Sequence, residues 1–547
     1  MLPKHIVLFV GALLCLDVAT ALDGAPPGPS RPIRAHIEAL RTPGGDAPEV
    51  QRGTIDLLDR FYVLRNDTPA WDAPGRLAAL ISELGALADD GLRPEDYGVD
   101  ALRRHLDHPP ADAVERTCVD LLASRAYLTA LLHLKFGRLD RATVEPQWQY
   151  NSSAGQPAAE ARLLVDAAVG VADPASVFAQ ARPTLPAYRA LRTAYVTLRA
   201  HAAAEIPAPL VPAGPLLRPG ADAPRVVQVR GRLAVAGYGA TNVGPPQVFD
   251  DALVATLMSF QHDHGLEPDG IVGPATLAAL NLSHADRLDR LRANLERLRW
   301  LAADLHDELV LVDVAGARIT YYRNGDAVWS ARTQVGRPER PTPLLKSQIT
   351  HFTFNPTWTI PPTILRRDKL PEIRRDPTYL AKNRIRVLDH AGNEIDPSTV
   401  DWAHPGAILL RQDAGEYNAL GQVAIRFPNP FAVYLHDTPN QRLFAREQRT
   451  FSSGCVRVEH AMALVELLLD DTGTGERERI DAILASGHTR NVSLARPVPL
   501  LIAYLTAHAD ADGHVRLRPD PYQLDRSLAQ ALAAPMPMPI RHPCLVH

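Results

Sequence analysis

The pattern of apolar and polar positions changes along the chain, and its first long stretch is helical. Residues 36–225 are rich in Ala, Leu and Arg, and their leucines recur at helical spacing, for example over 121–134 and 188–198. Prolines cluster at 207–224, which predicts a linker at the end of this stretch. We therefore expect an all-helical scaffold domain that carries no chemistry of its own.

A compact unit follows at 226–285. Its residues 252–264 predict an amphipathic helix, the glycines after them permit tight turns, and Pro274 suits the first turn of another helix. We expect a small three-helix module here. A connecting helix is expected at 286–306, with Trp300 packed against the helical scaffold.

From residue 307 the apolar positions alternate, which predicts β-strands. The pair Asn324-Gly325 is a hairpin signal between two of them. We expect a β-rich domain over 307–510 and an extension over 511–547 that is mobile or loosely packed from about residue 526. The expected strands include 309–314, 318–322, 327–330, 348–354, 423–427, 431–435 and 500–508, and the expected helices are 459–470 and 477–486.

Charged, mixed sequence interrupts this β pattern at 363–412. Its charges, among them Arg366, Arg367 and Asp368, are unsuited to a dry core and suit a mobile surface element. Enzymes often cover an acyl intermediate with such an element to exclude water. We expect an inserted lid over a site; a passive surface excursion is the alternative.

Composition adds limits to this picture of a multidomain α+β protein. Its 547 residues suffice for several domains, and 46% hydrophobic residues suffice for buried cores. A formal charge of −4 and a pI near 6.6 give no basic footprint for nucleic acid, so we expect no nucleic-acid partner.

The N-terminus has the form of an export signal. Lys4 precedes an apolar run at 6–16, and small residues at 19–21 fit cleavage. We therefore expect a signal peptide at 1–21, a flexible leader at 22–35 and a location in the periplasm. The run is shorter than the about 20 residues of a membrane span, so no stable span is expected after cleavage; an uncleaved anchor is the alternative.

Three cysteines would remain after cleavage: Cys118, Cys455 and Cys544. An odd number in an oxidising compartment predicts at least one free thiol. The spacing leaves open whether Cys118 and Cys544 pair. No Cys-x-x-Cys pair or zinc-type spacing occurs, so we expect no metal site.

A candidate nucleophile and base lie close in sequence. A cysteine nucleophile needs a neighbouring imidazole to take its proton, and His436 ends an apolar run that would hold its ring on a strand. Cys455 follows Gly454, where a sharp turn can expose the sulfur and backbone N–H groups. Alone this pair is weak evidence, because buried cysteines are common and usually inert.

The wider pattern resembles the L,D-transpeptidase family, a β-rich cysteine acyltransferase fold. The catalytic signature is His436 with Ser452-x-Gly454-Cys455-x-Arg457. The further blocks are Asn355-Pro356-x-Trp358, Arg411-Gln412, Asn418-Ala419-Leu420-Gly421 and Tyr434-Leu435-His436-Asp437-Thr438-Pro439. The module resembles a peptidoglycan-binding module through Phe260-Gln261 and Asp269-Gly270-Ile271-Val272-Gly273-Pro274-Ala275-Thr276. Together these features resemble the large, multidomain periplasmic branch of the family.

The resemblance implies catalytic roles for several residues. It implies that Cys455 attacks the carbonyl, that His436 accepts its proton, and that the backbone carbonyl of Asp437 orients the imidazole. Backbone N–H groups of Gly454 and Cys455 are expected to form an oxyanion hole, with Tyr434 lining it. No cofactor is implied.

Other residues of the motifs are expected to shape the site or meet substrate. Ser452 is expected to bond within the cysteine loop, and Asn355 to lie on the substrate side. Trp358 is either a wall of the site or core, and Arg457 either holds the loop or meets a carboxylate. Many relatives carry histidine where this chain has Ser453 and asparagine where it has Arg457, and both departures agree with the multidomain branch.

The implied reaction joins two peptidoglycan stem peptides. A tetrapeptide donor acylates the cysteine and loses its terminal D-alanine, and the side-chain amine of diaminopimelate on a second stem then gives a 3–3 cross-link. Alternatives are an L,D-carboxypeptidase, a transpeptidase that attaches a lipoprotein, and a silent wall-binding protein. A papain-like protease does not fit, because there the cysteine precedes the histidine. The oligomeric state stays open.

Overall fold

The computed structural model describes most of the chain. The described residues are 32–41, 49–146, 156–201, 209–239, 244–446, 448–471, 477–510 and 514–536. The predicted signal peptide and most of the predicted leader lie outside them. The prediction of a leader up to residue 35 is wrong at its end, because α1 (Pro32–Arg41) begins at Pro32 and buries Ile33 and Ile37. These two isoleucines lie one helical turn apart and attach the helix to the core.

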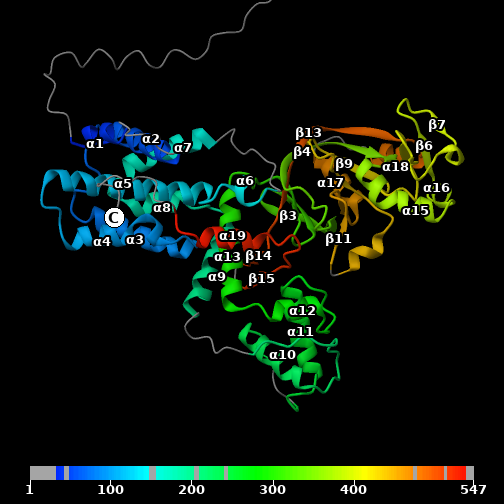
Figure 1. The fold of residues 1–547 in the computed structure, drawn as a ribbon, viewed down its shortest axis with the longest axis horizontal. Helices are drawn as coiled ribbons and strands as arrows, with labels where there is room; N and C mark the ends of the chain where they lie inside the picture. The colour runs from blue at the N-terminus through cyan, green and yellow to red at the C-terminus, as the bar shows by residue number, and fades with distance from the viewer. Residues whose placement is uncertain are drawn as a thin grey trace, which may run out of the picture.

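The N-terminal part is all-helical, as predicted (Figure 1). At its centre lies α5 (Ala113–Phe136), most of whose side chains are buried, and Asp112 caps it by accepting a hydrogen bond from Glu115 N at 2.8 Å. Several shorter helices pack around α5 and share one hydrophobic core with it. The other helices of this part are α2 (Glu49–Leu64), α3 (Arg76–Ala86), α4 (Val99–Asp107), α6 (Arg141–Val144), α7 (Gln156–Val169), α8 (Pro174–Ala181) and α9 (Pro186–His201).

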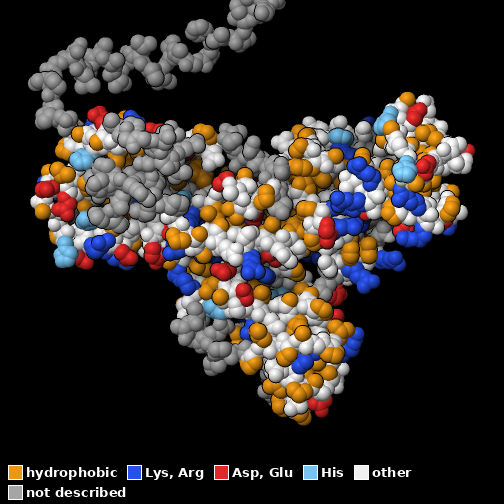
Figure 2. Space-filling view, viewed as in Figure 1, with side chains coloured by type: hydrophobic (Ala, Val, Ile, Leu, Met, Phe, Trp, Pro, Cys, Tyr) orange, Lys and Arg blue, Asp and Glu red, His pale blue; other side chains and the backbone are white. Residues whose placement is uncertain are grey.

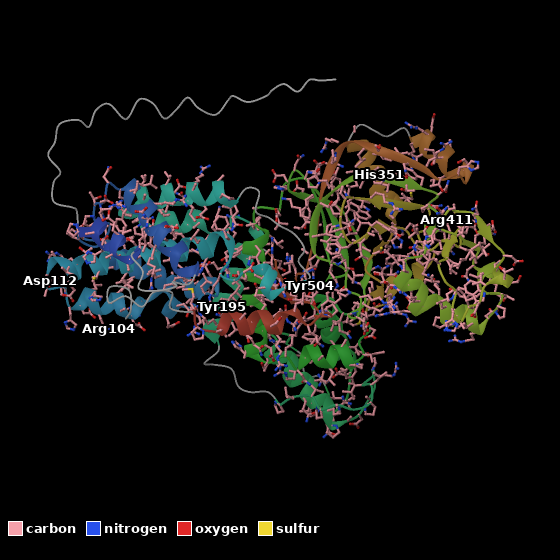
Figure 3. All side chains as sticks on the ribbon, turned by 45° about the horizontal axis from the view of Figure 1, so that its top comes forward. Arg104, Asp112, Tyr195, His351, Arg411 and Tyr504 are labelled. Carbon is pink, nitrogen blue, oxygen red and sulfur yellow. The ribbon has the colours of Figure 1, made fainter. Side chains whose placement is uncertain are left out.

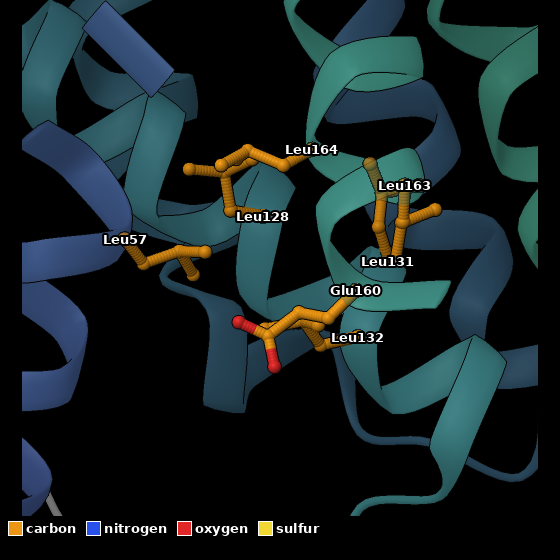
Figure 4. A pocket seen from close by; sticks show the side chains of 7 residues that line it. All are labelled: Leu57, Leu128, Leu131, Leu132, Glu160, Leu163 and Leu164. Atoms are coloured by element: carbon orange, nitrogen blue, oxygen red, sulfur yellow. The ribbon is translucent and has the colours of Figure 1, made fainter. Parts of the chain in front are cut away.

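A small pocket lies between α2, α5 and α7 (Figure 4). Its lining is hydrocarbon apart from Glu160, which pairs with Arg60 at 3.5 Å. Such a lining offers no nucleophile and no acid–base pair, so the pocket agrees with a scaffold role. The lining residues are Leu57, Leu128, Leu131, Leu132, Glu160, Leu163 and Leu164.

The next part is a three-helix module, as predicted, made of α10 (Pro224–Val235), α11 (Asp251–Asp263) and α12 (Pro274–Leu280). Gln261 holds its glycine-rich turn: its amide oxygen accepts from Gly270 N at 2.9 Å, and its amide nitrogen donates to the Asp269 carboxylate at 2.9 Å. Part of the predicted linker packs into the module. Val211 and Leu217 are buried in the module core, because these apolar residues alternate with the prolines of the segment.

A long helix, α13 (His284–Leu301), connects the domains (Figure 1). Trp300 packs against the scaffold as expected, and its indole N–H donates to Leu139 O at 3.2 Å. The buried Arg297 pairs with Glu145 of the scaffold at 2.7 Å and with Asp525 of the C-terminal extension at 2.6 Å. Buried charges are tolerated only when paired, so this trio fixes how three segments meet.

The expectation of a loosely packed tail from residue 526 is wrong up to residue 533. Helix α19 (Leu524–Ala533) buries Leu528 and Leu532 against α13 and the scaffold. These leucines recur at helical spacing, and the alanines between them allow close packing. Just before α19, β14 (Ala507–Ala509) and β15 (Val515–Leu517) pair with each other and pack on α9 and α13.

The C-terminal domain is built on a nine-stranded sheet, in the order β11-β3-β12-β10-β9-β4-β13-β1-β2. A further pairing of β2 with β3 closes the sheet on itself, so the domain is β-rich as predicted and has a barrel-like core. Helices α17 (Ala461–Asp471) and α18 (Arg477–Ser486) complete this core. The strands are β1 (Leu309–Asp313), β2 (Arg318–Arg323), β3 (Asp326–Gly336), β4 (Leu345–Phe354), β9 (Val423–Arg426), β10 (Leu435–His436), β11 (Thr450–Ser452), β12 (Val456–Val458) and β13 (Arg490–Ala503).

The insertion is a small subdomain with its own core, and not only a charged surface element. Its sheet has the order β5-β8-β6-β7 and begins at Trp358, so the unit spans 358–412 and is called the lid below. Apolar residues between the charges, such as Leu370, Ile373 and Leu380, are buried within it. Its elements are β5 (Trp358–Thr359), α14 (Pro362–Ile364), a π-helical turn η5 (Leu365–Lys369), α15 (Leu370–Arg375), α16 (Tyr379–Lys382), β6 (Ile385–Leu388), β7 (Glu394–Ile395) and β8 (Leu409–Gln412).

The barrel and the lid lie next to each other, as His351 on β4 and Arg411 on β8 indicate in Figure 3. Figure 2 shows Lys and Arg side chains gathered where these two units meet. The lid contributes exposed arginines at 366, 367, 374 and 375. In the described part of the chain, no helix has the length and apolar character needed to cross a membrane.

Candidate active site

The candidate nucleophile lies on a short loop between two strands of the barrel. Ser452 ends β11, and the chain passes through Ser453 and Gly454 to Cys455 just before β12. Gly454 has a φ of 119°, a conformation that side chains other than glycine rarely adopt. The glycine of the motif is therefore required by the turn, and the turn sets the direction of Cys455.

Hydrogen bonds fix this cysteine loop from within and from the side. Ser452 Oγ accepts from Gly454 N at 3.1 Å and donates to the carbonyl of Cys455. The neighbouring β3–β4 loop, residues 337–344, holds the outside: Arg337 N donates to Ser452 O at 3.0 Å, and Thr342 Oγ1 donates to Gly454 O at 2.9 Å. The loop backbone is thus held before any substrate binds, which is the requirement for a preorganised site.

His436 lies on β10, directly beside the strand that Cys455 leads into. β10 and β12 run parallel and pair His436 with Arg457. The Nδ1 of His436 lies 2.5 Å from the backbone carbonyl of Asp437. Because a carbonyl can only accept, Nδ1 carries the proton of the neutral ring, which leaves Nε2 as the acceptor.

Tyr434 forms the wall between the cysteine and the histidine. Its ring lies edge-on to His436 with centroids 5.7 Å apart, and its hydroxyl hydrogen-bonds to Cys455. Trp358 on β5 of the lid hydrogen-bonds to the same hydroxyl and also packs against the lid core, so its two predicted locations, wall or core, stay open. The guanidinium of Arg426 lies 4.2 Å from the Tyr434 ring centroid.

Burial dominates the electrostatics of the pair. Desolvation raises the pKa of the Cys455 thiol, while hydrogen bonds from Tyr434 and the charges of Arg426 and Arg457 oppose that rise. Desolvation and, to a smaller extent, the charge of Arg457 lower the pKa of His436 to about 3. Both shifts favour uncharged groups, so at neutral pH the resting site holds a thiol and a neutral imidazole.

A half-buried thiol with a raised pKa should be alkylated slowly at neutral pH. We expect iodoacetamide to modify Cys455 more slowly than free cysteine at pH 7, with a rate that rises with pH because the thiolate is the nucleophile and its pKa is raised. Arg426→Gln should slow the reaction further, since it removes a charge that stabilises the thiolate. Alkylation rates from intact mass against pH check this; fast, pH-independent labelling would contradict it.

The geometry changes one part of the predicted oxyanion hole. The N–H of Gly454 already donates to Ser452 Oγ, so it is not available to an oxyanion. Among the described residues, no acceptor pairs with the N–H of Cys455. The donors beside the sulfur are therefore the Cys455 N–H and Tyr434, which bonds to the thiol through both its hydroxyl and its backbone.

Two other predicted site residues have clear structural partners. Arg457 is half-buried and donates to Gln334 of β3 at 3.0 Å, and its two predicted roles, holding the loop or meeting a carboxylate, remain predictions. Asn355 donates to the carbonyls of Ile483 at 2.8 Å and Leu484 at 3.3 Å, so its amide holds the end of α18. A substrate contact by Asn355 remains a prediction.

Sequence reasoning missed the residues that reach the site from other strands. Arg426 and Thr342 have no motif of their own; they meet the site through the pairing of β9 with β10 and the course of the β3–β4 loop. The only available signal for Arg426 was a charge at the end of an apolar strand. Cys118 is disulfide-bonded, and Cys544 lies outside the described residues, so their predicted alternatives stay open.

Comparison with known families agrees with this geometry. Residues 307–480 match the profile described as "L,D-transpeptidase catalytic domain". Residues 307–480 form an L,D-transpeptidase catalytic domain. Residues 56–194 match a "Scaffold domain", and residues 222–280 match a "Putative peptidoglycan binding domain". The L,D-transpeptidase domain thus contains Cys455, His436 and the lid.

Similar proteins have been named in the same way. A "Putative L,D-transpeptidase" of Haemophilus influenzae is 35% identical over 242 residues, which cover 44% of this chain and 48% of that relative. The match therefore spans about half of the relative's length. Among solved structures, an L,D-transpeptidase from Xylanimonas cellulosilytica is 17% identical, covering 55% of this chain and all of the other, with a TM-score of 0.18. One from Mycobacterium smegmatis is 12% identical, covering 36% and 58%, with a TM-score of 0.17.

Proposed function

We propose that this protein is a peptidoglycan L,D-transpeptidase that forms 3–3 cross-links through a thioester on Cys455. The observation that carries the proposal is the arrangement at the cysteine loop. A thiol on a glycine-dependent turn lies beside a histidine whose Nδ1 is bonded to the Asp437 carbonyl, so its Nε2 is the base. The Tyr434 hydroxyl bonds to the same thiol.

The first half-reaction acylates the enzyme. Nε2 of His436 takes the thiol proton as the sulfur attacks the carbonyl that precedes the terminal D-alanine of a tetrapeptide stem. The Cys455 N–H and the Tyr434 hydroxyl then donate to the developing oxyanion; loss of one such donor costs about 10²–10³ in kcat in other acyl-transfer enzymes. The C–N bond breaks, the protonated His436 gives its proton to the amine, and D-alanine leaves.

The second half-reaction uses the same groups in reverse. The side-chain amine of diaminopimelate on a second stem attacks the thioester, and His436 takes its proton. The C–S bond then breaks, and the protonated His436 returns the proton to the Cys455 thiolate to restore the thiol. Arg426 and Arg457 lower the pKa of Cys455 and so stabilise the leaving thiolate. The carboxylates of the stem peptides suit the Lys and Arg side chains gathered between barrel and lid (Figure 2).

The nature of the acceptor separates this proposal from its alternatives. Water would make the enzyme an L,D-carboxypeptidase, and a lipoprotein lysine would make it an attachment enzyme. The deciding experiment is mass spectrometry of the products that the purified protein makes from tetrapeptide muropeptides. A 3–3 dimer is expected; tripeptide alone would favour the carboxypeptidase, and unchanged substrate would favour a silent wall-binding protein.

The module at 222–280 is proposed to hold the enzyme on the wall. It contains no nucleophile–base pair, and Gln261 serves its turn. A variant that lacks residues 211–282 should sediment less with intact sacculi and should still be acylated by a small β-lactam at an unchanged rate. Sedimentation and intact mass measure the two effects. Equal loss of both would make the module part of the catalytic fold.

Export to the periplasm, with cleavage after residue 21, belongs to the same proposal because the peptidoglycan substrate is located there. N-terminal sequencing of the protein isolated from cells tests it. A mature chain that begins near residue 22 is expected, and an intact Met1 would favour the membrane-anchor alternative.

A further inference from the structure

Besides Trp358 on β5, one turn of the lid connects it to the active site. The π-helical turn Leu365–Lys369 contains Asp368 and Lys369, whose side chains contact opposite sides of the site. π-turns are rare and frequent at functional sites, because the extra residue redirects neighbouring side chains. The same turn is therefore connected to the cysteine loop through Asp368 and Arg340, and it contacts Trp358 through Lys369.

The contact on the cysteine side is an ion pair extended by a hydrogen bond. Arg340 Nη1 and Nη2 bind the two oxygens of Asp368 at 2.6 and 2.8 Å, a bidentate pairing. Arg340 Nη1 also donates to Ser453 Oγ at 2.9 Å. The side chain of Arg340 is 13% exposed and that of Asp368 is 29% exposed, so solvent screens this pair less than an open surface pair.

The contact on the aromatic side involves the next residue. Lys369 Nζ lies 5.8 Å from the Trp358 ring centroid and donates to the Tyr379 hydroxyl at 2.7 Å. Trp358 in turn bonds to the Tyr434 hydroxyl beside the sulfur. Both donors proposed for the oxyanion, the Cys455 N–H and the Tyr434 hydroxyl, are thus connected to one turn of the lid.

The β3–β4 loop is anchored on its other side by the C-terminal extension. Tyr522 Oη donates to Gly336 O at 2.8 Å and accepts from Thr342 N at 3.0 Å. The loop backbone also packs tightly against the end of β3. A Cβ atom added at Gly336 would lie only 2.3 Å from the carbonyl oxygen of Arg340, so the two backbone segments are in close contact. Arg340 therefore extends from a fixed backbone, and Asp368 fixes the direction of its side chain.

We infer that Arg340 and Asp368 are positioning residues: their pair attaches the lid to the cysteine loop and holds Ser453–Gly454–Cys455 in the geometry that catalysis needs. The inference rests on the proposed function of Cys455. Three successive residues of the cysteine loop, 452, 453 and 454, are bonded to the β3–β4 loop, and only the bond to Ser453 depends on the lid. In this chain the hydroxyl of Ser453 accepts the hydrogen bond from the lid-paired Arg340.

The test compares Asp368→Asn with Glu372→Gln. Glu372 forms an exposed ion pair with Arg375 at 3.1 Å on the same lid and has no contact with the cysteine loop, which makes it a matched control. Steady-state release of D-alanine from a tetrapeptide donor gives kcat and KM. We expect Asp368→Asn and Arg340→Ala to lower kcat about 10-fold or more with little change in KM, because small misplacements of reacting groups cost rate more than binding.

Further measurements separate positioning from general stability. Arg340→Lys keeps the charge but loses the bidentate pairing, so it should recover part of the kcat that Arg340→Ala loses. Thermal unfolding of each variant shows whether the lid remains folded, and the isosteric Asp368→Asn keeps the fold testable. Wild-type kcat in folded Asp368→Asn and Arg340→Ala, or an equal loss in Glu372→Gln, would overturn the inference. A wild-type protein that releases no D-alanine would instead overturn the proposed function.

Discussion

Replacing Cys455 with alanine is expected to abolish cross-linking and to leave the fold intact. Only a sulfur nucleophile can form the proposed thioester, and the residual effect of oxyanion donors cannot replace a covalent step. Cys455 is half-buried, and its backbone carbonyl is held by Ser452, so truncation to alanine should disturb the loop little. The loss of cross-linked product should exceed about 10³-fold, measured as 3–3 dimer from tetrapeptide muropeptides.

A mass label tests the same residue without a peptide substrate. A carbapenem has a strained carbonyl that should acylate the nucleophile of an L,D-transpeptidase domain, and intact mass should show one adduct on the wild type and none on Cys455→Ala. Cys118 is a poor control position because it is disulfide-bonded, and its replacement would release a new thiol. An adduct that persists in Cys455→Ala, or product formed by that variant, would remove Cys455 from the mechanism.

Local sequence predicted the backbone turn at Cys455 and the strand position of His436, because the key residues are close in the chain. The Ser452-to-Arg457 motif determines its own turn through Gly454, and His436 sits at the end of a short apolar strand. These features depend on backbone conformation and on spacing, which a sequence displays directly. The contact of Nδ1 with the Asp437 carbonyl involves adjacent residues, and it too was predictable.

The contacts that bring distant segments together were not predictable in the same way. Arg340 and Arg426 reach the cysteine loop, and Tyr522 reaches the β3–β4 loop beside it. These residues come from three separate parts of the chain, and their positions depend on strand register and loop course. The Gly454 N–H was expected to be free, but Ser452 Oγ binds it across two residues. A side-chain acceptor such as this one and a substrate oxyanion would need the same backbone N–H, and the spacing of residues in the sequence does not show which of them it binds.

The fold was predictable where periodicity is strong and less so where charges mask it. The lid was interpreted as surface because Arg366, Arg367 and Asp368 dominate its start, yet Leu370 and Ile373 beyond them belong to a buried core. The tail was interpreted as loose because it is rich in Ala and Pro, although Leu528 and Leu532 recur at helical spacing. In both cases the apolar residues that decide packing are a minority of the segment.

Replacing His436 with glutamine should lower kcat by about 10²–10⁴, the range that general acid–base catalysis contributes. Glutamine keeps a similar volume on β10 but cannot take the thiol proton, so the variant depends on thiolate formed by solvent. The pKa of Cys455 is raised by burial, so that thiolate is scarce at neutral pH and increases with pH. Acylation of the variant should therefore accelerate steadily as pH rises, and its deficit against the wild type should shrink.

The wild type should respond to pH in a different way. Burial holds the pKa of His436 at about 3, below the ordinary value for histidine, so the ring stays neutral and able to accept a proton as the pH falls through the mildly acidic range. Protonation of the base should thus cause no loss of acylation rate between about pH 7 and pH 5, whereas a histidine with an ordinary pKa would lose most of its activity there. Rates of β-lactam adduct formation on both proteins between about pH 5 and 9, with folding checked by circular dichroism, measure the two profiles.

A His436→Gln variant with the wild-type rate and profile would mean that another group takes the thiol proton. A wild-type rate that falls with a midpoint near pH 6.5 would contradict this. It would mean that water reaches the imidazole, although the ring lies on β10 beside Tyr434 and Arg457.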